Sequence, residues 1–152
     1  MSLFEQISPD AVEPTRATTG SAGYDITATS LEWNESKTKI TYGTGLKLGD
    51  VPDGYFAALF PRSSIHNTDL RLANSVGVVD ADYKGEIRVV FDAPLSAAMV
   101  VSPGNLKIYK LGDKICQILF LPVLIGDSIV PTEERGDQGF GSTDTRTKRV
   151  KK

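Results

Sequence analysis

Hydrophobic and polar residues alternate with a period of two along much of the chain. From Lys39 to Leu48 the even positions are Ile, Tyr, Thr, Leu and Leu, and the odd positions are Lys, Thr, Gly, Gly and Lys. A second alternation places Ile87, Val89 and Phe91 between mostly polar neighbours. Successive side chains of a strand point to opposite faces, so this periodicity predicts β-strands over both segments.

Short apolar runs and turn-forming residues extend the same pattern. The runs cover residues 55–60, 76–79, 99–101 and 115–121, and Gly-, Pro-, Asn- and Asp-rich turns separate them. Residues 63–72 allow one or two helical turns at most. Many short strands with frequent turns predict an all-β fold, a barrel or a sandwich. We expect one such domain over residues 1–130, followed by a flexible C-terminal arm over residues 131–152.

Composition and charge narrow the class of protein. With 152 residues, 40% hydrophobic and 24% charged, the chain has the composition of an ordinary soluble domain. It contains no apolar run near the ~20 residues of a membrane span and no signal-like N-terminal segment. We therefore expect a cytoplasmic protein with no membrane partner. The single cysteine, Cys116, excludes an internal disulfide and, inside an apolar run, is expected to be a buried thiol.

The net charge of −2 is unevenly distributed. Residues 144–152 carry +4, so the first 143 residues carry −6. An acidic body argues against a nucleic-acid-binding surface. The basic tail is compatible with a polyanion, although most such tails are simply solvated.

Several known catalytic patterns are missing. The sequence has no Gly-x-x-x-x-Gly-Lys-Ser/Thr loop, no Gly-x-Gly-x-x-Gly segment after a strand and no Gly-x-Ser-x-Gly elbow. The single histidine, His66, lies in a polar stretch and is expected at the surface. One histidine and one cysteine do not make a zinc site without a carboxylate cluster, and none is suitably spaced.

The nine residues that begin at Arg135 form the most informative segment. They combine three glycines and an arginine with the Phe140 ring and the hydroxyls of Ser142 and Thr143. Glycines let backbone N–H groups approach an anion, the arginine and hydroxyls bind phosphate, and the ring offers a flat face to a base. The segment suits an arm that closes over a nucleotide. A solvated polar tail is the alternative.

Four other segments carry candidate residues. Asp80 leaves an apolar strand at a turn and is placed to orient a water, although a plain hairpin turn also favours Asp and Gly. Arg62 precedes two serines at a strand end, which predicts a phosphate clamp or a capped turn. Gln117 interrupts an apolar run and needs polar partners, which indicates a ligand or a network. Asp25 is a single carboxylate within a strand.

Taken in order, five segments resemble the trimeric dUTPase family, the dUTP diphosphatases. They are Ala22-Gly-Tyr-Asp-Ile26, Pro61-Arg-Ser-Ser64, Asn74 to Gly85, Gly112-Asp-Lys-Ile-Cys-Gln117, and Arg135 to Thr143. The resemblance implies a distorted jelly-roll (β-clip) protomer, a homotrimer with shared active sites, and Mg²⁺-dependent hydrolysis of dUTP to dUMP and pyrophosphate. Such an activity limits uracil incorporation into DNA and supplies dUMP for dTMP synthesis.

The resemblance also implies a role for each site residue. Asp80 would be the general base, Asn74 and the backbone of Gly77 and Val79 would read the uracil edge, and Tyr83 would pack under the deoxyribose. The phosphates would be held by Arg62, Ser63, Ser64 and Gln117, with Asp25 supporting Arg62. From the arm, Arg135, Gly141, Ser142 and Thr143 would hold the γ-phosphate, while Phe140 would stack on the uracil. In the family Mg²⁺ is bound by the triphosphate and waters, so no protein ligand is assigned.

The chain departs from the family pattern in three places. Asp137-Gln138 stands where a residue followed by glycine is usual, and Asp144 replaces a glycine after Ser-Thr. The segment 92–111 is longer than in typical members and is expected to form a surface loop. These departures bear on arm closure and leave the expected reaction unchanged.

Two alternative functions stay open. A dCTP deaminase shares the fold, but its catalytic glutamate would align on Val90 and its arginine on Asn67. A regulatory role through contacts with a protein partner, known for dUTPase-like proteins of viruses and phages, is the second. The segment 92–111 is where such contacts are expected.

Overall fold

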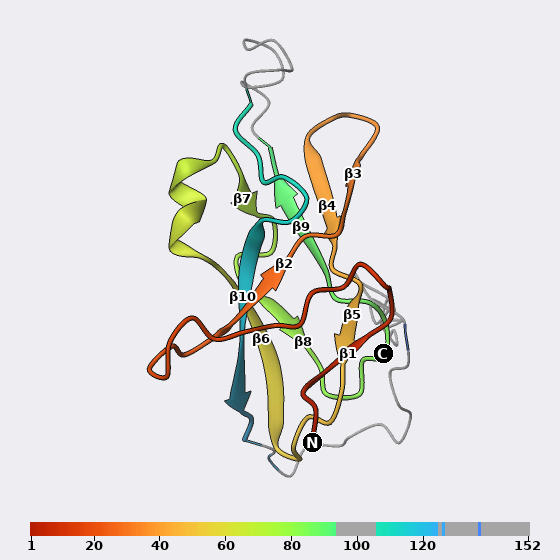
Figure 1. The fold of residues 1–152 in the computed structure, drawn as a ribbon, viewed down its shortest axis with the longest axis vertical. Coiled ribbons are helices and arrows are strands. Elements are labelled where there is room, and N and C mark those ends of the chain that lie inside the picture. Colours follow the sequence, from red (N-terminus) through yellow and green to blue (C-terminus); the bar gives the residue numbers. More distant parts are fainter. Residues whose placement is uncertain (94–105, 125, 127–136, 138–152) are drawn as a thin grey trace, which may run out of the picture.

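The computed structural model describes residues 1–93, 106–124, 126 and 137. This part of the chain is almost entirely β-structure, as predicted, with one short 3₁₀ helix, η1 (Figure 1). The predicted run 99–101 and the expected arm, apart from Asp137, lie outside the described residues. Within the described chain no helix is long and apolar enough to cross a membrane.

The elements follow one another at short intervals. They are β1 Phe4–Gln6, β2 Tyr24–Thr27, β3 Ser30–Trp33, β4 Lys39–Gly43, β5 Leu46–Leu48, β6 Tyr55–Pro61, η1 Ser63–Asn67, β7 Arg71–Leu72, β8 Gly77–Val79, β9 Arg88–Asp92 and β10 Lys114–Pro122. Gly54 and Gly112 take positive φ angles in the turns before β6 and β10, where glycine is tolerated without strain.

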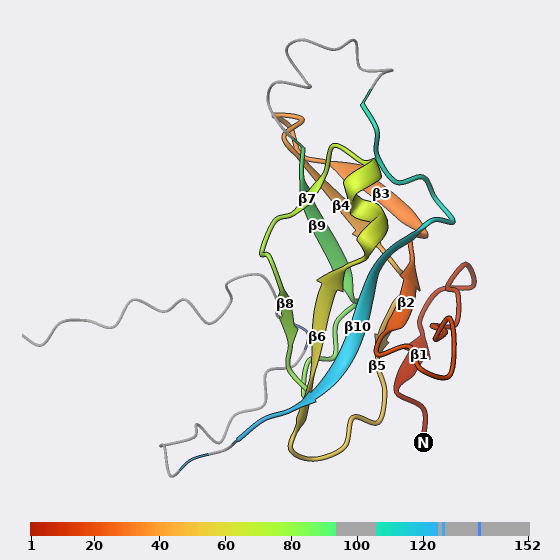
Figure 2. The same ribbon diagram turned by 90° about the vertical axis from the view of Figure 1, so that its left-hand side faces the viewer.

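Two four-stranded antiparallel sheets form the body of the domain. One has the order β2-β10-β6-β8 and the other β3-β4-β9-β7, while β1 and β5 make a separate ribbon. Figures 1 and 2 show the two sheets from orthogonal directions. Both sheets contribute fully buried side chains to one core, including Ile26 and Ile118 from the first and Ile40, Tyr42 and Phe91 from the second. The apolar alternation noted in the sequence is therefore the core-facing side of each strand.

The alternating segment 39–48 is two strands rather than one. β4 ends at Gly43 and pairs with β3 and β9, whereas β5 begins at Leu46 and pairs with β1. Gly45 has φ of +66° at the corner. The even positions stay buried across the break, so the hydrophobic pattern persists while the chain changes sheet.

The strands on either side of Asp80 do not form a hairpin with each other in the described structure. β8 pairs with β6 in one sheet, and β9 pairs with β4 and β7 in the other. Residues 80–87 therefore cross from one sheet to the other. A hairpin reading of this segment is wrong because each strand finds its partner elsewhere in the chain.

Part of the expected surface loop 92–111 belongs to the core. Leu106 and Ile108 are partly buried against it, and Tyr109 is only 5% exposed. The expectation is wrong for these residues, and residues 94–105 lie outside the described part. The expectations for Cys116 and His66 are confirmed, since the thiol is fully buried and the imidazole is exposed.

Candidate functional site

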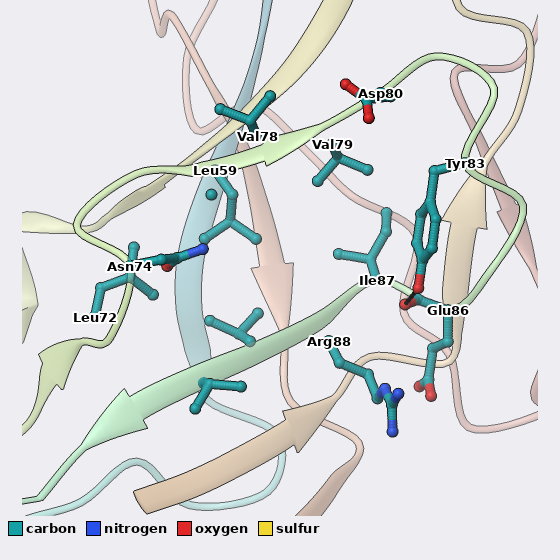
Figure 3. Close-up of a pocket in the computed structure, with 13 residues that line it drawn as sticks. Leu59, Leu72, Asn74, Val78, Val79, Asp80, Tyr83, Glu86, Ile87 and Arg88 are labelled. Atoms are coloured by element: carbon teal, nitrogen blue, oxygen red, sulfur yellow. Dashed lines mark hydrogen bonds between the residues drawn. The ribbon is translucent and has the colours of Figure 1, made fainter. Parts of the chain in front are cut away.

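A pocket of about 220 Å³ lies between β8 and β9, where the two sheets face each other (Figure 3). Three of the predicted site side chains line it, those of Asn74, Asp80 and Tyr83. Gly77 and Val79 line it from β8. The structure thus brings the expected general base, Asp80, together with four of the five residues that the resemblance assigns to the base and sugar of a nucleotide; the fifth, Phe140, lies outside the described residues.

A tight turn fixes Asp80 relative to Tyr83. The N–H of Tyr83 donates to the carbonyl oxygen of Asp80 at 3.0 Å. The Tyr83 hydroxyl donates to the carbonyl oxygen of Glu86 at 3.2 Å, so the ring folds down along the pocket wall (Figure 3). The carboxylate leaves the end of β8 while the ring stays buried, which places one acid beside one flat apolar surface.

Two glycines make room for these side chains. A Cβ on Gly85 would lie 2.6 Å from Cζ of the Tyr83 ring, so any side chain there would displace the tyrosine. A Cβ on Gly77 would lie 3.1 Å from Cβ of Leu59 and 3.3 Å from Nδ2 of Asn74. Close approach, rather than a special φ angle, is what these two positions require.

Glu86 connects the pocket to the β4–β5 corner. Its carboxylate accepts hydrogen bonds from the backbone N–H groups of Thr44 at 3.0 Å and Gly45 at 2.8 Å. Bonds from backbone N–H groups to a carboxylate are charge-assisted and strong. Glu86 therefore ties the loop that carries Asp80 and Tyr83 to the second sheet.

A second group of predicted residues surrounds Asp25 on β2. Asp25 is 9% exposed, and its carboxylate accepts from Nε of Arg62 at 2.8 Å and from Nζ of Lys114 at 3.0 Å. The two cations are more open, with side chains 30% and 43% exposed. We call Asp25, Arg62, Lys114 and Ser64 the charged cluster. The expected contact between Asp25 and Arg62 is present. That the charged cluster binds phosphate stays a prediction.

Serines and an amide lie beside the two cations of the charged cluster. Nη1 of Arg62 donates to the Ser64 hydroxyl at 3.4 Å and to the carbonyl oxygen of Lys114 at 3.3 Å. Ser63 is exposed at the start of η1. Nε2 of Gln117 donates to the carbonyl oxygen of Pro61 at 3.2 Å, which partly satisfies the polar side chain inside the apolar run. The arrangement offers two positive charges and several donors to an anion.

A β-bulge in β10 sets the position of Lys114. Cys116 pairs with Ile26 and Lys114 with Thr27, so Ile115 is the extra residue. The Cys116 thiol lies beneath the cluster, and its pKa is raised by burial and by the negative charge of Asp25, which makes it a poor nucleophile.

Asp80 at the pocket and Arg62 in the charged cluster lie far apart within one chain. Val79 pairs with Ala57 and Gly77 with Leu59, so Asp80 lies beside Phe56. Arg62 is six residues further along the same line of β6, toward η1 (Figure 2). At 3.3 Å per residue the separation is about 20 Å, which the side chains of Asp and Arg do not bridge.

Apolar side chains are exposed beside the pocket. β8 is an edge strand of its sheet, and Val78 on it is 62% exposed, with Val76 just before it 38% exposed. An unpaired edge with apolar side chains is a surface that proteins usually cover.

Sequence reasoning missed three residues of these sites. Lys114 pairs with Asp25, and Glu86 and Arg88 line the pocket. The signal for Lys114 was its place two residues after Gly112, at the start of β10, but the pairing with β2 is needed to identify Asp25 as its partner.

Of the expected arm, only Asp137 is described, and its backbone oxygen lies next to Gly85. The other arm residues assigned to the site lie outside the described part: Arg135, Phe140, Gly141, Ser142 and Thr143.

Comparisons with known proteins identify the family of the chain. The family model for dUTPase matches residues 10–144. The deoxyuridine 5'-triphosphate nucleotidohydrolase of Desulfitobacterium hafniense is 39% identical over 138 residues, covering 86% of this chain and 85% of its own. The crystal structure of the dUTPase from Streptococcus mutans has a TM-score of 0.64 at 27% identity, over 82% of this chain and 98% of that one.

A phage protein of known structure has a fold similar to that of this chain. A point mutant of the dUTPase from phage phi11 of S. aureus has a TM-score of 0.66 at 22% identity, over 86% of this chain and 95% of its own, and it coordinates a structural Mg(II) ion. For the deaminase alternative, Val90 lines the pocket with an apolar side chain where that enzyme would carry its glutamate.

Proposed function

The chain belongs to the dUTPase family and is a dUTP diphosphatase, and from that premise we propose how its residues perform the reaction. Asp80 takes a proton from a water that attacks the α-phosphorus of dUTP. The bond from that phosphorus to the oxygen bridging to the β-phosphate breaks, which gives dUMP and pyrophosphate. The observation that carries this proposal is the pocket, which places the Asp80 carboxylate in one cavity with the Asn74 amide and the buried Tyr83 ring.

The pocket supplies selectivity for deoxyuridine in this proposal. The Asn74 amide has both a donor and an acceptor, which match the edge of a uracil ring. Tyr83, held by Gly85 and by its bond to Glu86, packs against the deoxyribose and excludes a 2′-hydroxyl. A site shaped in this way rejects UTP through steric overlap and needs no separate recognition step.

The charged cluster supplies phosphate binding. Phosphoryl transfer depends mainly on positioning and on neutralising charge, and Arg62 and Lys114 bring two positive charges together with nearby hydroxyls. Asp25 holds both cations in place. We also assign phosphate contacts to Ser63, Ser64 and Gln117, and closure over the nucleotide to the arm with Arg135, Phe140, Gly141, Ser142 and Thr143.

We assign Mg²⁺ to the substrate's phosphates and waters. Mg²⁺ retains several waters and is commonly held by phosphates with few protein ligands. No group of three or more His, Cys, Asp or Glu side chains that fits a metal ion gathers among the described residues. When bound, the ion neutralises phosphate charge. The cations of the charged cluster suit the phosphate oxygens themselves.

The 20 Å separation leads us to propose a site shared between copies of the chain. Asp80 of one copy and Arg62 of another then meet around one triphosphate, because within one chain they do not. The exposed edge with Val76 and Val78 lies beside the pocket and suits the contact between copies. A closed C₃ trimer gives three equivalent shared sites.

Mixing two inactive variants tests the shared site. Asp80→Asn and Arg62→Gln, unfolded and refolded together in equal amounts, should regain about a quarter of wild-type activity. In a random trimer a site is whole only when its Asp80 comes from the Arg62→Gln chain and its Arg62 from the Asp80→Asn chain. Each variant refolded alone should stay inactive, and native mass spectrometry should confirm mixed trimers.

A matched control uses the double variant Asp80→Asn/Arg62→Gln mixed equally with wild type. A shared site predicts about a quarter of full activity, whereas a site within one chain predicts about half. Mixed trimers that give no activity with the two single variants and half activity with the double variant would exclude the shared site.

A further inference from the structure

Tyr109 carries a buried hydroxyl with no hydrogen-bond partner among the described residues. The side chain is 5% exposed, and it lies in the segment that the sequence marked as a surface loop. A buried polar group without a partner destabilises a protein, and the great majority of such groups are bonded. A bound state in which the hydroxyl gains a partner removes this cost.

The ring of Tyr109 is held firmly in place. It packs against Phe91 and Tyr42, with ring centroids 5.7 Å and 6.4 Å away. The Tyr42 hydroxyl donates to the carbonyl oxygen of Tyr109 at 2.8 Å. Both the ring and the backbone of Tyr109 are held by these contacts, and the hydroxyl is buried.

The Tyr109 hydroxyl lies close enough to Ser64 and Arg62 of the charged cluster to interact with both. Burial raises the pKa of Tyr109, and the neighbouring Ser64 hydroxyl and Arg62 guanidinium offset part of that rise. The group therefore keeps its proton at neutral pH and is a donor. Its neighbour Ser64 already accepts a long hydrogen bond of 3.4 Å from Nη1 of Arg62.

The donors and acceptors around Ser64 determine which partner its hydroxyl proton can bind. A serine hydroxyl has one proton to give and two lone pairs that accept. The Arg62 guanidinium is a donor only, and Tyr109 has a donor without an acceptor. If Ser64 accepts from both, its own proton is free for an anion in front of the cluster.

We propose that Tyr109 is a positioning residue for the triphosphate, which holds Ser64 as a hydrogen-bond donor to a phosphate oxygen. The inference rests on the proposed function, since it names the phosphate that Ser64 meets. On binding, hydrogen bonds form a chain from the Tyr109 hydroxyl through the Ser64 hydroxyl to phosphate. Hydrogen bonds in such a chain strengthen one another, so the tyrosine acts on the ligand without touching it.

The test is Tyr109→Phe, which removes one oxygen and keeps the packing. Pyrophosphate should inhibit this variant less well and KM for dUTP should rise, each by about fivefold, the usual scale for one hydrogen bond. Inhibition by deoxyuridine and kcat should change less than twofold. Stability to urea should be unchanged or higher, because an unpaired buried group is removed.

Two further variants make the test specific. Tyr42→Phe removes a hydroxyl from the same aromatic cluster, but one that bonds backbone, so stability should fall while pyrophosphate inhibition is kept. In a Ser64→Ala background, adding Tyr109→Phe should weaken pyrophosphate inhibition no further, because the two residues act as one unit.

Either of two results would overturn the inference. One is wild-type pyrophosphate inhibition, or lowered stability, in Tyr109→Phe. The other is an additive effect in the double variant. A wild-type protein that fails to hydrolyse dUTP would instead contradict the proposed function, so the two failures are distinguishable.

Discussion

The pocket near Asp80 and the charged cluster around Arg62, at opposite ends of the β6–β8 pair, differ in the kinds of side chain that form them. Near Asp80 the pocket combines an apolar wall with a few polar side chains, and glycines leave room for them. At the other end, around Arg62, a buried carboxylate organises two cations and a hydroxyl. The pocket depends on shape, whereas the cluster depends on charge. The difference implies that substitutions at the two ends will be separable by what they damage.

The largest effect is expected at the catalytic end. Asp80→Asn is nearly isosteric but removes the base, so kcat should fall by roughly 10²-fold or more while dUTP affinity changes little. Steady-state kinetics with a coupled pyrophosphate assay measure this. Near-wild-type kcat in the purified variant would remove Asp80 from its proposed role.

At the charged end the main loss should be stability. Asp25→Asn leaves Arg62 and Lys114 without their anion, and the free energy of unfolding should fall by about 2 kcal/mol. The loss is smaller than for a fully enclosed pair because both cations are partly exposed. Urea titration followed by circular dichroism gives the value.

The control for this variant is the exposed pair between Lys39 and Asp92. Asp92→Asn should cost no more than about 0.5 kcal/mol, since surface ion pairs contribute little. Equal losses in the two variants would mean that burial of Asp25 does not matter.

A change in the shape of the pocket should lower the selectivity for dUTP over UTP. Gly85→Ala pushes the Tyr83 ring from its position, so the ratio of kcat/KM for dUTP to that for UTP should fall by about tenfold. Gly20→Ala is the matched control, because no atom lies within 4 Å of its Cβ position. An unchanged ratio in Gly85→Ala would show that Tyr83 does not exclude the 2′-hydroxyl.

The smallest effect is confined to alkaline pH. Burial raises the pKa of the Cys116 thiol above its ordinary value of 9.0, so the unfolded chain loses that proton first. Stability contributed by the neutral thiol is complete below pH 9 and is lost as pH rises, by about 1 kcal/mol per pH unit. Cys116→Ala should remove this part of the slope in urea titrations between pH 8 and 10. An identical slope would show that the thiol stays accessible to base.

The strand pattern was predictable because burial repeats every second residue, but partner choice was not. The alternation at 39–48 gave no sign of the corner at Gly45, since that break depends on Glu86 about forty residues away. Asp80, Asn74 and Tyr83 were identifiable together from their motif. Lys114 and Tyr109 could not be identified from the sequence, because the residues that they contact lie far away along the chain.

The place of β10 in its sheet has a consequence for synthesis of the chain. β10 is the last described strand in sequence, yet it lies between β2 and β6 and pairs with both. While the ribosome is still making earlier residues, those two strands have no partner between them, and open edges favour association with other chains. The nascent protein therefore cannot complete this sheet until Pro122 has emerged, and fragments that end before Lys114 should need chaperones to stay soluble.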